Sequence, residues 1–66
     1  MTIVESRFKQ DDRVQVRQTE GASALFQGET GTIIEIVAYQ GFCDYWVRVD
    51  SGKNVQFSER ELALIN

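Results

Sequence analysis

Two runs of alternating apolar and polar residues flank a turn signal in the second half of the chain. Residues 44–49 and 53–58 each alternate with a period of two, which is typical of half-buried strands. Between them lies Asp50-Ser51-Gly52, whose residue types favour a turn. The pattern predicts a β-hairpin, and a fold for this chain has to bury one face of it.

The length of the turn decides which side chains share the buried face. A two-residue turn would mix apolar and polar side chains on both faces. A three-residue loop, with Gly52 left-handed at a β-bulge, instead pairs Val47 with Val55 and Tyr45 with Phe57. Because a slip of one residue turns every side chain over, the apolar set favours this loop. The opposite face then carries Trp46, Arg48, Asn54 and Gln56.

Further strands are predicted toward the N-terminus. Residues 13–17 alternate as a half-buried strand does, and residues 32–37 are β-branched except at Glu35. The apolar residues of the second segment cannot all face one side, so this strand is either covered on both faces or bent by a β-bulge. Residues 38–42 are expected to form a hairpin tip.

Two irregular segments complete the chain. Residues 18–31 are mostly polar and predict a long loop, with Leu25 and Phe26 as the large apolar residues available to pin it. Ser58-Glu59-Arg60-Glu61 matches the capping-box pattern S-x-x-E and predicts a single helical turn. Residues 63–66 then suffice for a short closing strand beside the first one.

These elements predict an all-β fold, a five-stranded SH3-like barrel with a one-turn helix before the last strand. With 66 residues and no linker or repeat, the chain is expected to form one barrel over residues 11–66, preceded by a loosely held N-terminal segment over residues 1–10. A domain of this size buries only about 60% of the surface of its unfolded chain. Tight packing, or association with another chain as in a homo-oligomer, would compensate for the thin core.

Missing residue types narrow the chemistry. The chain has no histidine, which removes imidazole acid/base catalysis and His-ligated metal sites. Cys43 is the single cysteine, so it fits a reducing compartment and is expected to be a small buried hydrophobe. No apolar run reaches the roughly 18 residues of a membrane span. We expect a cytoplasmic protein that is not an enzyme, with no catalytic residue, cofactor or metal and no membrane partner.

The charge balance favours a protein as the partner. Seven Lys and Arg against ten Asp and Glu give a net charge of −3, which opposes binding to a phosphate backbone. Arg13, Arg17 and Arg48 are all expected to project outward. A local basic stripe of these three arginines is the basis of an alternative function, contact with RNA or DNA.

A glycine-rich segment leads into the strand predicted at residues 32–37. In Gly28-Glu29-Thr30-Gly31, the glycines are expected to let the loop turn tightly into that strand. Together with Thr32-Ile33-Ile34-Glu35-Ile36, this segment resembles the Gly-x-x-Gly-x-Val-x-x-Ile signature of the KOW element, part of certain SH3-like barrels. The resemblance implies the same barrel, and KOW-type barrels include nucleic-acid binders.

A longer stretch carries a second resemblance. From residue 28 to residue 65, with Tyr39-Gln40-Gly41 and a final Glu61-Leu62, the order of features is similar to the variable chain of ferredoxin-thioredoxin reductase and to photosystem I subunit IV. This resemblance implies a non-catalytic accessory or regulatory chain that docks on a larger protein, such as a subunit of a redox or photosynthetic electron-transfer complex.

The end of the chain resembles an enzyme family. Val55-Gln56-Phe57 and Ile65-Asn66 are similar to the end of the plasmid-borne type II dihydrofolate reductases, oligomers whose pore is lined by a Val-Gln-Ile-Tyr segment. Phe57 and Ser58 stand where that segment has Ile and Tyr. The resemblance implies, as a second alternative, an oligomeric enzyme with Gln56 at its pore.

The strand pattern also predicts where a partner binds. Aromatic and arginine side chains on an exposed strand face and at a hairpin tip are typical of protein interfaces. The predicted partner-binding residues are Trp46, Arg48, Gln56, Tyr39 and Phe42. Two of these residues have an alternative that stays open from the sequence. The N-terminal segment, with Phe8, covers Trp46 instead of leaving it exposed, and Trp46 is expected outside the central core whether or not it is covered. Phe42, for its part, tucks beneath the barrel as a plug.

Overall fold

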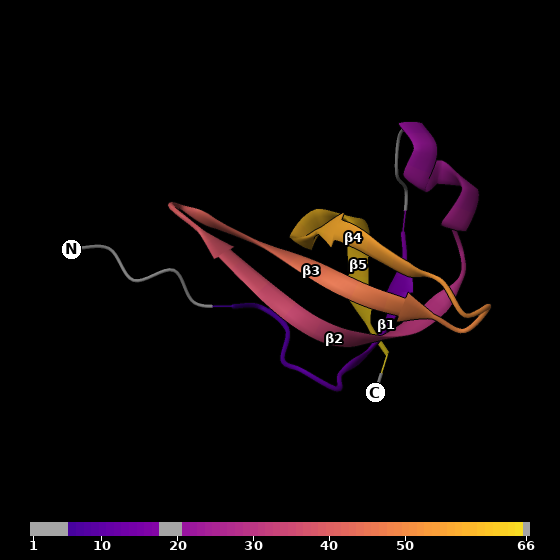
Figure 1. The fold of residues 1–66 in the computed structure, drawn as a ribbon, viewed down its shortest axis with the longest axis horizontal. Coiled ribbons are helices and arrows are strands. Elements are labelled where there is room, and N and C mark those ends of the chain that lie inside the picture. Colours follow the sequence, from indigo (N-terminus) through magenta and orange to yellow (C-terminus); the bar gives the residue numbers. More distant parts are fainter. Residues whose placement is uncertain (1–5, 18–20, 66) are drawn as a thin grey trace.

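The structure, a computed structural model, describes residues 6–17 and 21–65, and over these residues the chain forms five strands and two short 3-10 helices. The elements are β1 (Arg13–Val16), η1 (Gly21–Phe26), β2 (Thr30–Tyr39), β3 (Phe42–Val49), β4 (Asn54–Ser58), η2 (Glu59–Glu61) and β5 (Leu62–Leu64). The strands form one antiparallel sheet in the order β4-β3-β2-β1-β5 (Figure 1). The predicted all-β fold, with five strands and a one-turn helix before the last, is confirmed.

The hairpin of β3 and β4 has the register that the apolar pattern favours. Tyr45 pairs with Phe57 and Val47 pairs with Val55. At the turn, the N–H of Gly52 donates to the carbonyl of Val49 at 2.8 Å, and Gly52 has a φ of 107°. The glycine therefore adopts the left-handed conformation that a three-residue loop requires.

A β-bulge bends β2. Its register with β3 runs from Ile33 opposite Val47 to Glu35 opposite Trp46, which leaves Ile34 as the extra residue. Of the two explanations for the continuous apolar run, the structure thus selects the bulge. The first half of β2 pairs with β1 as well as β3, while the second half pairs with β3 in the long hairpin that extends away from η1 (Figure 1).

The hairpin tip predicted for residues 38–42 is shorter in the structure. Tyr39 pairs directly with Phe42, so only Gln40 and Gly41 form the turn. Gly41 has a φ of 92°, and a glycine that adopts positive φ allows a two-residue connection. Ala38, Tyr39 and Phe42 consequently belong to strands.

The prediction of one long loop over residues 18–31 is wrong in part. Residues 21–26 form η1, and β2 already begins at residue 30; residues 18–20 lie outside the described part of the chain. Phe26 does pin this region, because its ring lies 6.4 Å from that of Phe57 in an edge contact. Leu25 does not, since 83% of its surface is exposed.

The end of the chain closes the sheet as expected. The N–H of Ser58 donates to Oε1 of Glu61 at 2.8 Å, which is the carboxylate arm of the predicted capping box. Leu62 and Leu64 then pair with Val16 and Val14, so β5 covers the free side of β1. This strand begins at Leu62, one residue before the predicted segment, and Asn66 lies outside the described residues.

The core lies on the inner face of the sheet and includes part of the N-terminal segment. Its fully or almost fully buried side chains are Phe8, Val14, Val16, Ile33, Cys43, Tyr45, Val47, Val49, Phe57 and Leu62. Cys43 is thus the small buried hydrophobe that the sequence predicts. The Phe8 ring meets the Tyr45 ring edge-on, with centroids 5.2 Å apart.

Candidate functional site

The five predicted partner-binding residues share one face of the β2-β3-β4 sheet. Tyr39 pairs with Phe42, and Trp46 pairs with Gln56. Phe42, Trp46 and Arg48 are separated by even numbers of positions along β3, so their side chains leave the same side of the strand. This side is opposite to that of Tyr45 and the core. We call the surface formed by Tyr39, Phe42, Trp46, Arg48 and Gln56 the outer face.

An aromatic pair occupies the tip of the outer face. The rings of Tyr39 and Phe42 stack with their centroids 4.7 Å apart and their planes at 19°. Both stay accessible, with 43% of Tyr39 and 52% of Phe42 exposed. Phe42 is therefore not a plug beneath the sheet, because the direct Tyr39–Phe42 pairing turns its side chain to the outer side. The stack gives the hairpin tip a preformed apolar surface.

Polar contacts hold the middle of the outer face. Nε2 of Gln56 donates to Oδ2 of Asp44 at 2.9 Å and lies 3.5 Å from the hydroxyl of Tyr39. These contacts join side chains from β4, β3 and β2. These hydrogen bonds restrain the exposed Gln56 carboxamide, so less conformational freedom is lost if it binds a partner.

Trp46 lies between Glu35 and Gln56 in the cross-strand register and is half-buried. It is outside the central core, as the sequence predicts. Phe8 packs against the neighbouring Tyr45, whose side chain points to the inner side. The indole and the Phe8 ring consequently belong to opposite sides of β3.

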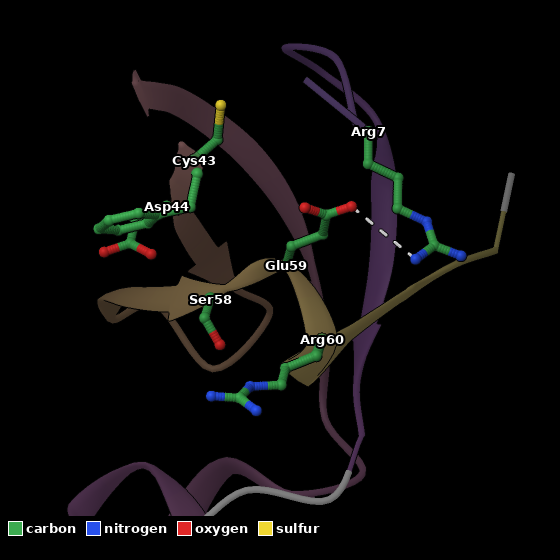
Figure 2. A pocket seen from close by; sticks show the side chains of 7 residues that line it. Arg7, Cys43, Asp44, Ser58, Glu59 and Arg60 are labelled. Carbon is green, nitrogen blue, oxygen red and sulfur yellow. Dashed lines mark ion pairs between the residues drawn. The ribbon is translucent and has the colours of Figure 1, made fainter. Parts of the chain in front are cut away.

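An open cleft of about 390 Å³ adjoins the outer face at Phe42. Figure 2 shows its lining side chains, with Arg7 directed toward Glu59 and the Arg60 side chain on the other side of Glu59. The Arg7 guanidinium lies 3.8 Å from the Glu59 carboxylate. The lining residues are Arg7, Phe42, Cys43, Asp44, Ser58, Glu59 and Arg60. The cleft offers charges of both signs beside one aromatic wall.

Sequence reasoning identified the outer face but missed the cleft. The outer face follows from a period of two along adjacent strands, which is visible in the sequence. The cleft instead gathers the N-terminal segment, the start of β3 and η2, which share no periodicity. Within the part of the chain that the structure describes, no three His, Cys, Asp or Glu side chains lie close enough to hold a metal ion.

The basic stripe predicted for Arg13, Arg17 and Arg48 is interrupted at Arg13. Its guanidinium donates to both carboxylate oxygens of Asp50, at 2.9 and 2.8 Å, and to the hydroxyl of Thr32 at 2.9 Å. This bidentate pair ties β1 to the turn after β3 and compensates the charge of Arg13. The surface around Arg13 is therefore less positive than the sequence alone suggests.

The Arg13–Asp50 pair predicts a specific response to acid. Hydrogen bonds from Arg13, followed by one from Thr30, lower the pKa of Asp50. Its contribution to stability is therefore fully present above the ordinary pKa of 3.8 and is lost as the pH falls below that value. We expect wild type to melt slightly higher than Asp50→Asn at neutral pH, with a difference that shrinks below about pH 4. Thermal melts of both proteins at neutral pH and below about pH 4 measure this difference in melting temperature. A difference that persists unchanged in acid would contradict a stabilising role of the ionised Asp50.

Fold and site together define a small all-β protein with an exposed aromatic face beside an open cleft of mixed charge. No model of a known protein family, no curated protein and no solved structure matches the chain. Among the described residues, no helix combines the length and the apolar character needed to cross a membrane.

Proposed function

We propose that this chain is a non-catalytic binding module that docks on a larger protein through the outer face. The observation that carries the proposal is the stacked, exposed pair of Tyr39 and Phe42 on the same face as Trp46, Arg48 and Gln56. Aromatic and arginine side chains provide much of the binding energy at protein interfaces. A stacked pair adds rigid apolar area at little entropic cost, since it is already ordered.

The surroundings of the outer face define the chemistry of the partner. Phe42 belongs to the aromatic pair and also lines the cleft, so one partner segment can cover the ring and place a polar side chain beside the Arg7–Glu59 ion pair. The net charge of −3 favours a partner with a basic surface, because complementary charge speeds encounter. We propose a partner that offers an apolar pocket to the aromatic pair and basic residues around it.

The fold supports an assignment to the SH3-like small barrels with a KOW-like element. The support is the strand order β4-β3-β2-β1-β5, the bent second strand and the one-turn helix before the last strand. By resemblance to the variable chain of ferredoxin-thioredoxin reductase and to photosystem I subunit IV, the proposed role is that of an accessory or regulatory subunit. A redox or photosynthetic electron-transfer complex in the cytoplasm is the corresponding assembly.

Removing the aromatic pair tests the docking role. The double variant Tyr39→Ala/Phe42→Ala should lose at least about tenfold in affinity for the partner, because two hot-spot side chains are truncated. Its melting temperature should fall by only a few degrees, since both rings are exposed. Affinity capture from native lysate with quantitative mass spectrometry identifies the partner, and titration with the purified partner gives the affinity.

A matched control truncates an exposed apolar residue elsewhere. Leu25 on η1 is the most exposed large apolar side chain of the described residues, and Leu25→Ala should capture the partner as wild type does. Equal capture by all three proteins would show that docking uses another surface.

Two alternative functions give different results with the same protein. A nucleic-acid-binding barrel would bind single-stranded RNA with an affinity that falls steeply as salt rises, and Arg48→Ala would weaken it. A dihydrofolate reductase-like oligomer would show NADPH-dependent shifts of the Gln56 amide signals in NMR spectra. The absence of both responses, together with loss of capture in the double variant, would favour the docking role.

A further inference from the structure

The strand β4 leaves one side of the sheet open. It stands at the end of the order β4-β3-β2-β1-β5 and pairs with β3 alone among the described strands. Figure 1 shows β4 running beside β3. An edge strand of this kind presents backbone donors and acceptors that can pair with another chain.

The hydrogen-bond pattern shows which backbone groups are available. The N–H of Val49 donates to the carbonyl of Lys53 at 2.9 Å, and hydrogen-bonded positions recur at every second residue of an antiparallel pair. Val55 and Phe57 therefore bond to β3. The residues whose backbone groups point away from β3 are Asn54, Gln56 and Ser58.

The edge carries little of the usual protection against pairing. Residues 54–58 contain no charged residue and no proline, and their register with β3 is unbroken. The N–H of Ser58 is taken by Glu61, whereas neither Asn54 nor Gln56 makes a backbone–backbone hydrogen bond to a described segment other than β3. The opposite edge, β5, has only three residues, and the following Ile65 donates its N–H to Arg13. These features make β4 the favoured edge.

We propose that β4 pairs antiparallel with β4 of a second copy of this chain, around a twofold axis at Gln56. This register places Gln56 opposite Gln56 and Asn54 opposite Ser58 of the second copy. Lys53 directly precedes β4 and Glu59 begins η2, so this register brings Lys53 toward Glu59 of the second copy at the end of the paired strands. The symmetry repeats this complementary pair at the other end, so both ends of the paired strands gain an attraction between opposite charges.

The charges at the ends of the strand favour this axis over its neighbours. An axis at Val55 would place Lys53 opposite the apolar Phe57 and lose the charge match. An axis at Phe57 would place Lys53 opposite Glu61, whose carboxylate already accepts the N–H and hydroxyl of Ser58. Only the axis at Gln56 gives Lys53 a carboxylate outside the capping box, that of Glu59, which in its own copy lies 3.8 Å from the exposed Arg7 guanidinium.

The pairing extends the outer face without using its aromatic tip. The two five-stranded sheets join into one ten-stranded sheet, with the two Gln56 side chains at its centre and an aromatic pair on either side of them. The interface rests on a few backbone hydrogen bonds and buries less surface area than the interfaces of stable dimers do. We therefore expect the dimer to be weak. It is independent of the proposed docking function, which needs only one copy.

A proline at the axis tests the pairing directly. Gln56→Pro removes an N–H that points away from β3, at an edge position where proline is tolerated. We expect wild type to form a dimer with a Kd on the order of 100 µM, and Gln56→Pro to raise this Kd at least roughly tenfold. Gln56→Thr keeps the N–H and should stay within about threefold of wild type. Sedimentation equilibrium over a concentration series measures the dimer Kd of wild type and both variants, and circular dichroism tests whether each protein is folded.

Charge reversal tests the register with variants that keep the strand intact. Lys53→Glu and Glu59→Lys should each weaken the dimer by about threefold or more, and the double variant should restore it. A protein that stays monomeric up to about 1 mM would overturn the proposal. Masses above that of a dimer would also overturn it, because they would indicate that β4 pairs with β5 of another copy. The same holds for a dimer whose Kd is unaffected by Gln56→Pro, and for a double variant that dimerises no more tightly than the single variants.

Discussion

Replacing Gly31 by alanine is expected to lower the free energy of unfolding of this protein by about 3 kcal/mol. Gly31 is buried within β2, where its register neighbours are Val14 on β1 and Val49 on β3. A Cβ at this position would lie 2.6 Å from the carbonyl oxygen of Arg48, 2.7 Å from Cγ1 of Val47 and 2.9 Å from Cα of Val49. Two of these atoms belong to the backbone of β3, so no rotation of a side chain relieves the clash.

The size of the effect follows from the small total stability. A chain of 66 residues has about 3 to 10 kcal/mol to lose. Forcing β2 and β3 apart costs about 3 kcal/mol, because it disturbs the pairing around Val47 and Val49 in the core. Urea unfolding followed by tryptophan fluorescence gives the free energy of unfolding, and the change should appear as a lower midpoint or a missing transition.

A second glycine supplies the control for backbone strain. Gly28 has a φ of 89°, and a Cβ added to it would meet no atom within 4 Å, so Gly28→Ala should cost only about 1 kcal/mol. Equal losses for Gly31→Ala and Gly28→Ala would mean that the close approach of β3 to Gly31 adds nothing to the cost of the substitution.

Gly31 also shows what sequence reasoning can and cannot find. The pattern assigns Gly28 and Gly31 the same role, as turn residues before a strand. Gly28 has this role, because its φ is positive, whereas Gly31 serves the close approach of two strands. That approach is made by Val47, Arg48 and Val49 of β3, which lie far along the chain and leave no local signal near Gly31.

The alternation of apolar and polar residues along the strands explains which parts of the structure could be predicted from the sequence. The register of β3 with β4 follows from the apolar alternation and from Gly52, and the same arithmetic places Trp46, Arg48 and Gln56 on one face. Tyr39 and Phe42 join that face because the turn between them has two residues rather than the longer tip that the sequence predicts. The bulge at Ile34 was one of two alternatives, since the sequence does not show which strands cover β2.

The N-terminal segment provides the second large expected effect. Phe8→Ala should lower the free energy of unfolding by about 3 to 4 kcal/mol, because it removes a ring from a residue that is only 3% exposed. The ring packs edge-on against Tyr45, and the N–H of Arg7 donates to the Tyr45 hydroxyl at 3.0 Å. Asp11 adds a backbone hydrogen bond to Ile33 at 2.8 Å, so these residues are joined to the core at several points.

The same substitution at Phe42 isolates burial as the cause. Phe42→Ala removes an identical ring, but one from a residue that is 52% exposed, and should cost less than about 1 kcal/mol. Thermal and urea unfolding of both variants compare the two sites, and similar losses would place Phe8 outside the core. Arg7 lines the cleft and directly precedes Phe8, so Phe8→Ala should also loosen the Arg7–Glu59 ion pair at the cleft. Phe42→Ala removes the aromatic side of the cleft and should leave the fold intact. Partner binding should therefore weaken in both variants, with a large loss of stability in Phe8→Ala alone.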